Sequence, residues 1–418
     1  MKETLERCAG LDVHRDTIVA CILIGYGDST KKEIKTFSTQ TCGIKALACW
    51  MEEYKIHDVV IESTGIYWKP IFNIFEGRFN VVLANAYHVK NAKGRKTDVK
   101  DSEWLCRLFK ADAISPSFIP PKNIRRLREL VRYRKTLVRE RARVKNRIIK
   151  TLENSNIKLS SVFSDVFGYT SWLIITKIID GERDPSKLTS YIHGRVKASQ
   201  EEIQKALEGT LSNDDIIILK HMSLQVEQRE KQIISIDKEI KNHSKAFENE
   251  LRLLQTIPGV SEAIALVIIS EIGVDMNQFP SHEKLASWAA LCPGNNESAG
   301  KQKSGRTRRG NNYLKSALVQ AAWAASRTKN TYLQSKYKAL AARKGGKKAA
   351  IAVAHRILVA SYYILRDKCG FKELGAQFLD QLQAERKVKY YVKRLEELGY
   401  HIQTIEKVKD GVRELVFI

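Results

Sequence analysis

Apolar strand-like runs alternate with helical patterns over about the first hundred residues, which restricts this part of the chain to a mixed α/β architecture. Strand patterns cover 9–23, 33–37, 58–62 and 80–83. Helical patterns cover 44–54 and a short stretch after Trp68. Hairpin-forming strands followed by β-α-β alternation predict a mixed sheet flanked by helices.

Four carboxylates occupy special places in this pattern. Asp12 lies inside an apolar run from about residue 8 to 24 that is typical of one strand, and Glu62 closes a second apolar run. Asp98 and Asp101 open an amphipathic helix, and their spacing of three places them on one helix face. Acids at strand ends and on one helix are the arrangement of a ribonuclease-H-like fold, which the order of elements favours.

Convergence of these acids predicts a site for two Mg²⁺ ions about 3.5–4 Å apart, the spacing that serves phosphodiester chemistry. The alternative is that each acid is a solvated charge or a helix cap, and Asp98 in particular could cap its helix. Asp12 and Glu62 interrupt or end apolar strands, so the metal-site interpretation is favoured.

Charge and cysteine content indicate the class of partner. The chain has 71 Lys and Arg against 47 Asp and Glu, a net charge of +24 that attracts polyanions such as nucleic acids. Its seven cysteines form no C-x-x-C pair, which is typical of reduced thiols in an intracellular protein. No apolar run of transmembrane length and no signal peptide are evident, so we expect a soluble cytoplasmic protein without a membrane partner.

The middle of the chain contains two long helical patterns with a coiled-coil signal. Residues 122–150 hold 13 basic and two acidic side chains, with Leu130, Leu137 and Val144 at heptad spacing. A second such pattern runs from about 215 to 254, and 155–210 suggests a small helical insertion between them. The two helices could pair with each other or build a dimer.

The near-uniform charge of the first long helix predicts contact with nucleic acid. Neighbours at i,i+4 of like sign repel unless an anion such as a phosphate backbone lies between them. We assign this contact to Arg139, Arg143 and Arg147. The alternative is a solvated helix face.

The second half combines a Pro-Gly turn with a long acid-free segment. The turn at 258–259 predicts either a phosphate-binding helix-hairpin-helix element or an ordinary helix connection. No acid occurs between Glu297 and Asp367, where 16 Lys or Arg occur. A flexible basic loop at 293–310, bracketed by helices, predicts a phosphate-handling site rather than a disordered linker. Its basic residues are Lys301, Lys303, Arg306, Arg308 and Arg309.

The motifs "GLDVH", "IESTGIYW", "KTDVKDSEWL", "PGVSEAIALVIISEIG" and "LCPGNNESAGKQKSGRTRRGNNYLKSAL" occur in that order. In these motifs the chain resembles the IS one-ten family of insertion-sequence transposases, DEDD recombinases similar to Piv-type DNA invertases. The resemblance covers about residues 7 to 365. It implies a RuvC-like catalytic domain at 1–115, a basic coiled-coil region at 116–252 and a transposase domain at 253–366. Residues 367–418 continue past the shared core as a C-terminal extension of unknown role, in which 386–407 is typical of a helix followed by a strand.

The same resemblance implies the chemistry and the partners. Asp12, Glu62, Asp98 and Asp101 correspond to the metal-binding DEDD acids, and Ser298 in "ESAGK" is the best match to the catalytic serine. Ser304 is the nearest competitor, and Glu297 departs from the small or hydroxyl residue expected before the serine. Implied partners are donor and target double-stranded DNA, a structured bridge RNA as guide, and further copies of the chain as a dimer or tetramer.

Two other functions are compatible with parts of the sequence. A RuvC-like metal-dependent nuclease or Holliday-junction resolvase would use the same acids with water as nucleophile, and it would leave a free DNA end where the recombinase leaves a protein-linked one. A basic RNA- or DNA-binding scaffold would leave the spacing of the four acids unexplained.

Overall fold

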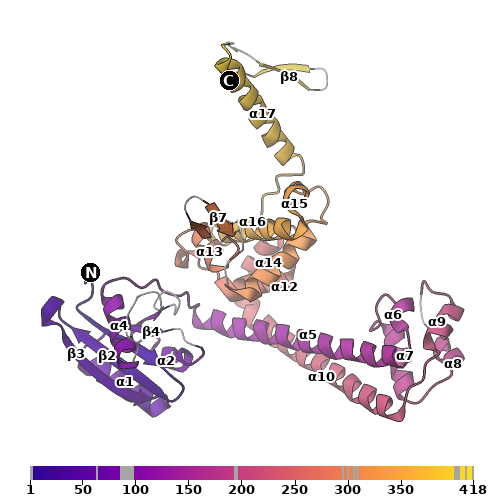
Figure 1. Ribbon diagram of the computed structural model, residues 1–418, viewed down its shortest axis with the longest axis horizontal. Helices are drawn as coiled ribbons and strands as arrows, with labels where there is room; N and C mark the ends of the chain where they lie inside the picture. Colours follow the sequence, from indigo (N-terminus) through magenta and orange to yellow (C-terminus); the bar gives the residue numbers. More distant parts are fainter. Residues whose placement is uncertain are drawn as a thin grey trace. The chain divides into compact units, whose positions relative to one another are not determined.

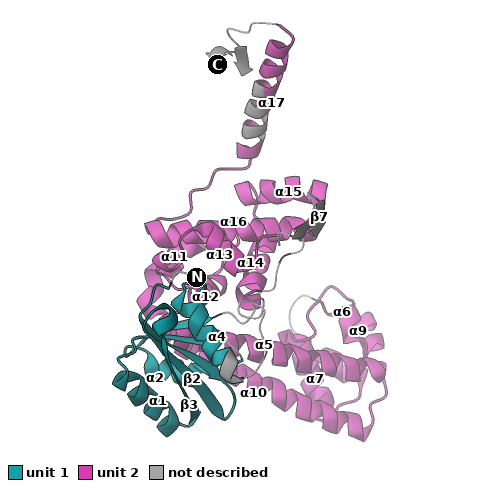
Figure 2. Cartoon of the chain, turned by 60° about the vertical axis from the view of Figure 1, so that its left-hand side comes forward, with its two compact units in different colours: residues 1–119 teal, residues 120–418 magenta. Residues whose placement is uncertain are grey.

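The computed structural model describes residues 3–62, 65–84, 98–192, 196–293, 296–298, 301–304, 307, 310–399, 405–409 and 412–416. The chain divides into two compact units, residues 1–119 and 120–418, which Figure 2 shows in teal and magenta. The first unit is a mixed α/β domain and the second is mostly helical.

A five-stranded sheet forms the centre of the first unit, in the order β3-β2-β1-β4-β5. The first three strands pair antiparallel, and β4 and β5 run parallel to β1. This is the mixed sheet that the strand and helix patterns predict. The strands are β1 (Arg7–Val13), β2 (Thr17–Ile24), β3 (Lys31–Ser38), β4 (Asp58–Glu62) and β5 (Asn80–Ala84).

Helices cover both faces of this sheet. On one face, α1 (Thr41–Glu53) and α2 (Trp68–Phe75) pack on a core that includes Leu11 and Ile61. On the other face, α4 (Asp98–Lys110) packs over the alternate strand residues, with Cys106 against Cys8 and Leu105 against Val60. Because strand side chains alternate between faces, residues 8, 10 and 12 share the α4 side.

The apolar run from 8 to 24 is two strands and not one. β1 and β2 form a hairpin whose turn contains His14, Arg15 and Asp16, with the backbone N–H of His14 donating to the carbonyl of Thr17 at 2.9 Å. Three consecutive polar residues cannot continue a strand buried on both faces, so the chain reverses there. The turn places Asp12 near the carboxyl end of β1.

Two long antiparallel helices, α5 (Lys122–Asn154) and α10 (Asn213–Ser244), lie side by side in the second unit (Figure 1). Ion pairs join Arg134 to Asp237 and Arg141 to Glu230, the second at 3.5 Å. Of the two arrangements that the sequence left open, the structure shows the pairing of the two long helices with each other within the chain. The predicted helix 215–254 is interrupted, since a 3-10 turn at Lys245–Phe247 separates α10 from α11 (Glu248–Gln255).

The expected helical insertion closes the far end of this helix pair (Figure 1). It contains α6 (Leu159–Val162), α7 (Tyr169–Ile179), α8 (Pro185–Ser190) and α9 (Gln200–Leu207). Its core joins Ile174 of α7 to Ile148 of α5 and Leu219 of α10.

In the rest of the second unit, α13 (His282–Trp288), α14 (Asn312–Ala325) and α15 (Tyr332–Lys344) pack against α16 (Gly346–Asp367), and α12 (Glu262–Ile272) packs against α14 and α5. After it come α17 (Phe378–Glu397) and a hairpin of β8 (Ile405–Lys409) and β9 (Val412–Val416). The helix and first strand of this extension match the sequence pattern. In the described part of the chain, α16 alone is long and apolar enough to cross a bilayer, and 56% of its most apolar window is buried, as in the core helix of a globular domain.

Candidate active site

The packing of α4 on β1 fixes where the acids lie along the sheet. A Cβ on Gly10 would stand 2.6 Å from the carbonyl oxygen of Ser102 and 2.7 Å from the Cβ of Cys106, so helix and strand touch through the glycine. Cys106 lies beside Cys8, with 3.5 Å between the two Sγ atoms. Residue numbers fall along α4 as they rise along β1, so the helix runs antiparallel to the strand.

This antiparallel packing brings the first turn of α4 to the carboxyl end of the strands. Four helical residues rise about 6 Å and two strand residues about 6.6 Å, so each helix turn matches two strand positions. Cys106 of the helix lies beside Cys8 of the strand, and Ser102 lies beside Gly10. One further helix turn and two further strand residues set position 98 level with Asp12. Leu105 packs with Val60, and the same step sets Asp101 level with Glu62.

Asp12 and Glu62 themselves occupy matched places on neighbouring strands. Leu11 pairs with Ile61 in the parallel ladder, so the two acids follow at the same level and on the α4 face. Asp12 is 7% exposed, while Glu62 and Asp101 are half-buried. The side chain of Asp98 is not among the described ones, although its backbone begins α4.

His14 is a neighbour of Asp12 that the sequence pattern did not single out. Its Nε2 lies 3.3 Å from Oδ2 of Asp12. A buried carboxylate requires a polar partner, and the imidazole is one such partner. The signal was present in "GLDVH", because residues two apart along a strand direction share one face.

The donor set at this edge fits a hard divalent cation in kind. All four acids offer carboxylate oxygens, the ligand type that Mg²⁺ prefers. Among the residues that the structure describes, no three His, Cys, Asp or Glu side chains stand together as a group that could hold a metal. The structure therefore does not bring Asp12, Glu62 and Asp101, whose side chains it describes, together as a metal-binding group.

The segment predicted as a flexible loop contains a β-hairpin. β6 (Asn296–Ser298) pairs antiparallel with β7 (Lys301–Ser304), and Ser298 is paired directly with Lys301. The prediction of an irregular loop is wrong for these residues, because two short polar runs separated by two residues, the second a glycine, suit a tight hairpin. Pro293 and Thr307 form a further bridge. Lys303 and Ser304 lie in β7, whereas Arg306, Arg308 and Arg309 lie outside the described residues.

A buried charged network anchors the chain immediately after this segment. Glu271 of α12 is fully buried and accepts hydrogen bonds from Nε and Nη2 of Arg132 at 2.8 and 2.7 Å. Nδ2 of Asn311 donates to the same carboxylate at 2.7 Å, and Oδ1 of Asn311 caps α14 by accepting from two backbone N–H groups. Glu271 thus joins α5, α12 and the start of α14.

Arg128 completes this network from α5. Its guanidinium donates to the carbonyl oxygens of Ser270 at 2.9 Å and of Glu271 at 2.7 Å. Burial lowers the pKa of Arg128 to about 10, and the charge of Glu271 opposes that shift. The side chain therefore remains charged at neutral pH.

Two sequence models of known families match two separate segments of the chain. A DEDD transposase model of the IS110 type, described as a transposase, matches residues 9–157, and a model described as "Transposase IS116/IS110/IS902 family" matches residues 251–338. The chain belongs to the IS110 family of transposases. No curated protein matches it.

The matched segments of this transposase contain the predicted site residues. Asp12, Glu62, Asp98 and Asp101 lie in the first match, and Ser298 lies in the second. An IS110 transposase is an enzyme of DNA transposition and recombination, so DNA is its substrate.

From Arg134 onward, the arginines of α5 in the transposase fall into two classes. Arg134 and Arg141 face α10 and are paired with its acids. Arg139, Arg143 and Arg147 are exposed, follow one another at i,i+4, and have no ion pair with any residue that the structure describes. The exposed class is the one that the sequence selects for nucleic-acid contact.

The Pro-Gly turn of the transposase joins α11 to α12 and packs on α14. Gly259 has a φ of 85°, and a Cβ there would stand 2.4 Å from the carbonyl oxygen of Ala321. Close packing between helices accounts for this glycine without a phosphate ligand.

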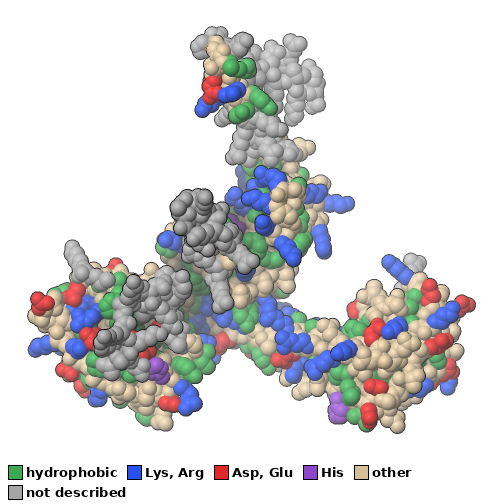
Figure 3. Space-filling model, in the orientation of Figure 1, with side chains coloured by type: hydrophobic (Ala, Val, Ile, Leu, Met, Phe, Trp, Pro, Cys, Tyr) green, Lys and Arg blue, Asp and Glu red, His purple; other side chains and the backbone are tan. Residues whose placement is uncertain are grey.

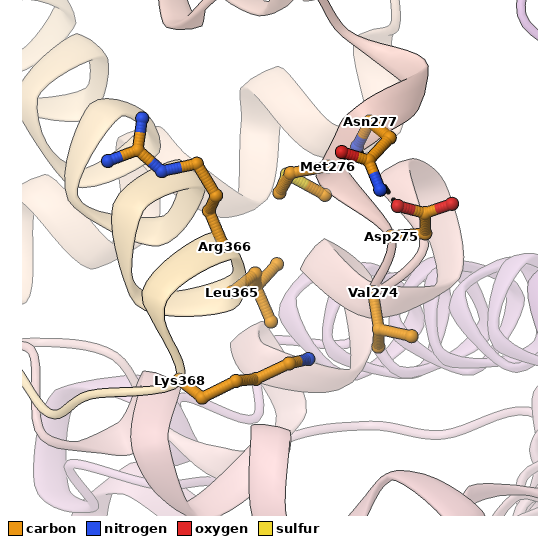
Figure 4. Close-up of a pocket in the computed structure, with 7 residues that line it drawn as sticks. All are labelled: Val274, Asp275, Met276, Asn277, Leu365, Arg366 and Lys368. Atoms are coloured by element: carbon orange, nitrogen blue, oxygen red, sulfur yellow. Dashed lines mark hydrogen bonds between the residues drawn. The ribbon is translucent and has the colours of Figure 1, made fainter.

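A pocket of about 320 Å³ lies where α16 ends (Figure 4). It is lined by none of the predicted site residues but by residues 274–277 together with Leu365, Arg366 and Lys368. Its charged lining is already engaged: Arg366 pairs with Asp367 at 2.6 Å, Lys368 with Glu250 at 3.0 Å, and Asp275 accepts from the backbone of Asn277. The transposase therefore offers no free acid, base or nucleophile there among the residues that line it.

Proposed function

We propose that this IS110 transposase is an RNA-guided recombinase that cleaves and exchanges DNA strands through a phosphoserine intermediate. The observation that carries the proposal is the alignment of Asp12 and Glu62 with the first turn of α4, which begins with Asp98 and includes Asp101. Acids at the carboxyl ends of parallel strands beside a helix support a RuvC-like, ribonuclease-H-like assignment for residues 1–115.

In this proposal the four acids would hold two Mg²⁺ ions, whose positive charge would polarise the scissile phosphate and stabilise the departing 3′ oxygen. Burial of Asp12 and its fixed strand position orient that carboxylate before substrate arrives.

Ser298 supplies the nucleophile. Its hydroxyl passes its proton to solvent and its oxygen attacks phosphorus, the P–O bond to the DNA 3′ oxygen breaks, and that oxygen takes up a proton to leave a free hydroxyl. A 3′ hydroxyl of the exchanged strand then attacks the phosphoserine and restores the serine, so one phosphodiester bond replaces another. The proposed phosphate-neutralising residues are Lys301, Lys303, Arg306, Arg308 and Arg309, and those for nucleic-acid backbone are Arg139, Arg143 and Arg147.

The partners proposed are donor and target DNA, a structured guide RNA and other copies of the chain, in the bacterial cytoplasm. The charge of +24 and the exposed arginines of α5 support a large polyanionic partner. The competing nuclease or junction resolvase uses the same acids with water, and it differs in leaving an unattached DNA end.

Substitution of the acids tests the proposal. Asp12→Asn or Glu62→Gln should lower strand exchange by more than about 100-fold, since changes outside the ligands alone cost about 10–100-fold, while DNA affinity stays near wild type. Asp16→Asn is the matched control, because Asp16 is an exposed acid of the β1–β2 turn paired with Arg15. Exchange at the wild-type rate by both acid variants in Mg²⁺ would show that the site has been misplaced.

A further inference from the structure

A second basic surface lies at the corner where α15 meets α16. Arg343 and Lys344 end α15, Lys347 and Lys348 begin α16, and all four side chains are exposed. None of the four has an ion pair or hydrogen bond with another residue in the described part of the chain. Figure 3 shows Lys and Arg side chains gathered over these helices.

This corner is free of compensating charge from its own segment. No acid occurs between Glu297 and Asp367, so no carboxylate of α14, α15 or the first turns of α16 can neutralise the four cations. Crowded like charges cost free energy unless an anion approaches them. The surface therefore favours a polyanion.

An aromatic pair, of which Trp323 is exposed and Tyr337 half-buried, adjoins the same corner. Trp323 of α14 is 40% exposed, and its ring centroid lies 5.6 Å from that of Tyr337 of α15. A Cβ on Gly346, the first residue of α16, would stand 2.9 Å from the Tyr337 hydroxyl and 3.7 Å from the Trp323 ring. The indole is thus next to the residue that precedes Lys347.

We propose that the α14–α16 corner, made of Trp323, Arg343, Lys344, Lys347 and Lys348, binds an unpaired DNA strand. Cations beside an exposed aromatic ring suit a single strand, since the cations neutralise its phosphates and a base stacks on the face of the ring. A fully paired duplex offers no free base face to Trp323. The occupant is DNA because strand exchange by the proposed function exposes unpaired strands, and the proposal rests on that function to this extent.

Fluorescence anisotropy of an oligo-dT of about 20 nucleotides measures its binding by the full-length protein. The measurement is made in EDTA, so it tests the proposal without catalysis. Trp323→Ala should weaken binding about tenfold, within the range for removal of one stacked base, and Trp323→Phe should recover most of it. Tyr169→Ala is the control, because Tyr169 is a 79% exposed aromatic in the helical insertion. Lys347→Ala with Lys348→Ala should lower the salt slope by about 1.4, or roughly 0.7 for each phosphate that is no longer neutralised.

Three outcomes would overturn the proposal: equal affinity of Trp323→Ala and wild type, an equal fall in affinity for a blunt duplex of the same length, or a fall confined to oligo-U RNA. Because no cleavage is measured, failure here leaves the acid and serine variants unaffected. Conversely, inactive chemistry at Ser298 would not alter the oligo-dT result.

Discussion

Among single residues, Glu271 has the most demanding environment. It is a fully buried carboxylate that accepts from Arg132 and Asn311 and joins three helices. Removal of one partner from a buried ion pair leaves the other charge buried without compensation.

Glu271→Leu should therefore lower the free energy of unfolding of the helical unit by about 3–5 kcal/mol. Chemical denaturation followed by circular dichroism measures this. Glu129→Ala is the control, since Glu129 is exposed on α5 and meets Arg126 only at 3.8 Å, and it should change stability by less than about 0.5 kcal/mol. Similar destabilisation by both variants would mean that the network does not stabilise the unit.

Among the helices and strands, α5 has one face that builds the fold and one that is left for a partner. Arg134 and Arg141 pair with α10, whereas Arg139, Arg143 and Arg147 are exposed. Heptad spacing identified the packed face, but which arginines were paired depended on the position of α10, which the sequence did not reveal.

Reversal of charge at Arg139, Arg143 and Arg147 to Glu should weaken DNA binding and flatten its salt dependence by about 2–3 in slope, or roughly 0.7–0.9 for each phosphate contact. The matched control reverses Lys231, Lys238 and Lys241, which are exposed on α10. If both triple variants change the slope equally, net charge alone explains the effect and this face of α5 is merely solvated.

Over the full chain, local patterns predicted the mixed sheet, the long helix pair and the insertion, because each depends on a periodicity within one segment. They failed at the β1–β2 turn, where His14 to Asp16 break an apolar run too briefly to register, and at the β6–β7 hairpin, where glycine and basic residues resemble a loop. The position of Asp98 and Asp101 along the sheet, relative to Asp12 and Glu62, depends on the contact of Gly10 with α4. Only tertiary packing reveals that contact.

Covalent linkage of Ser298 to DNA during strand exchange is the step on which the proposed mechanism depends, and a labelled donor–target substrate analysed under denaturing conditions detects it. Wild type should give a protein-linked DNA band, Ser298→Ala should lack it, and Ser304→Ala should retain most of it. A band that persists in Ser298→Ala and vanishes in Ser304→Ala would place the nucleophile one motif later. If no covalent species forms even on a nicked trapping substrate, the serine mechanism is contradicted and the nuclease takes its place.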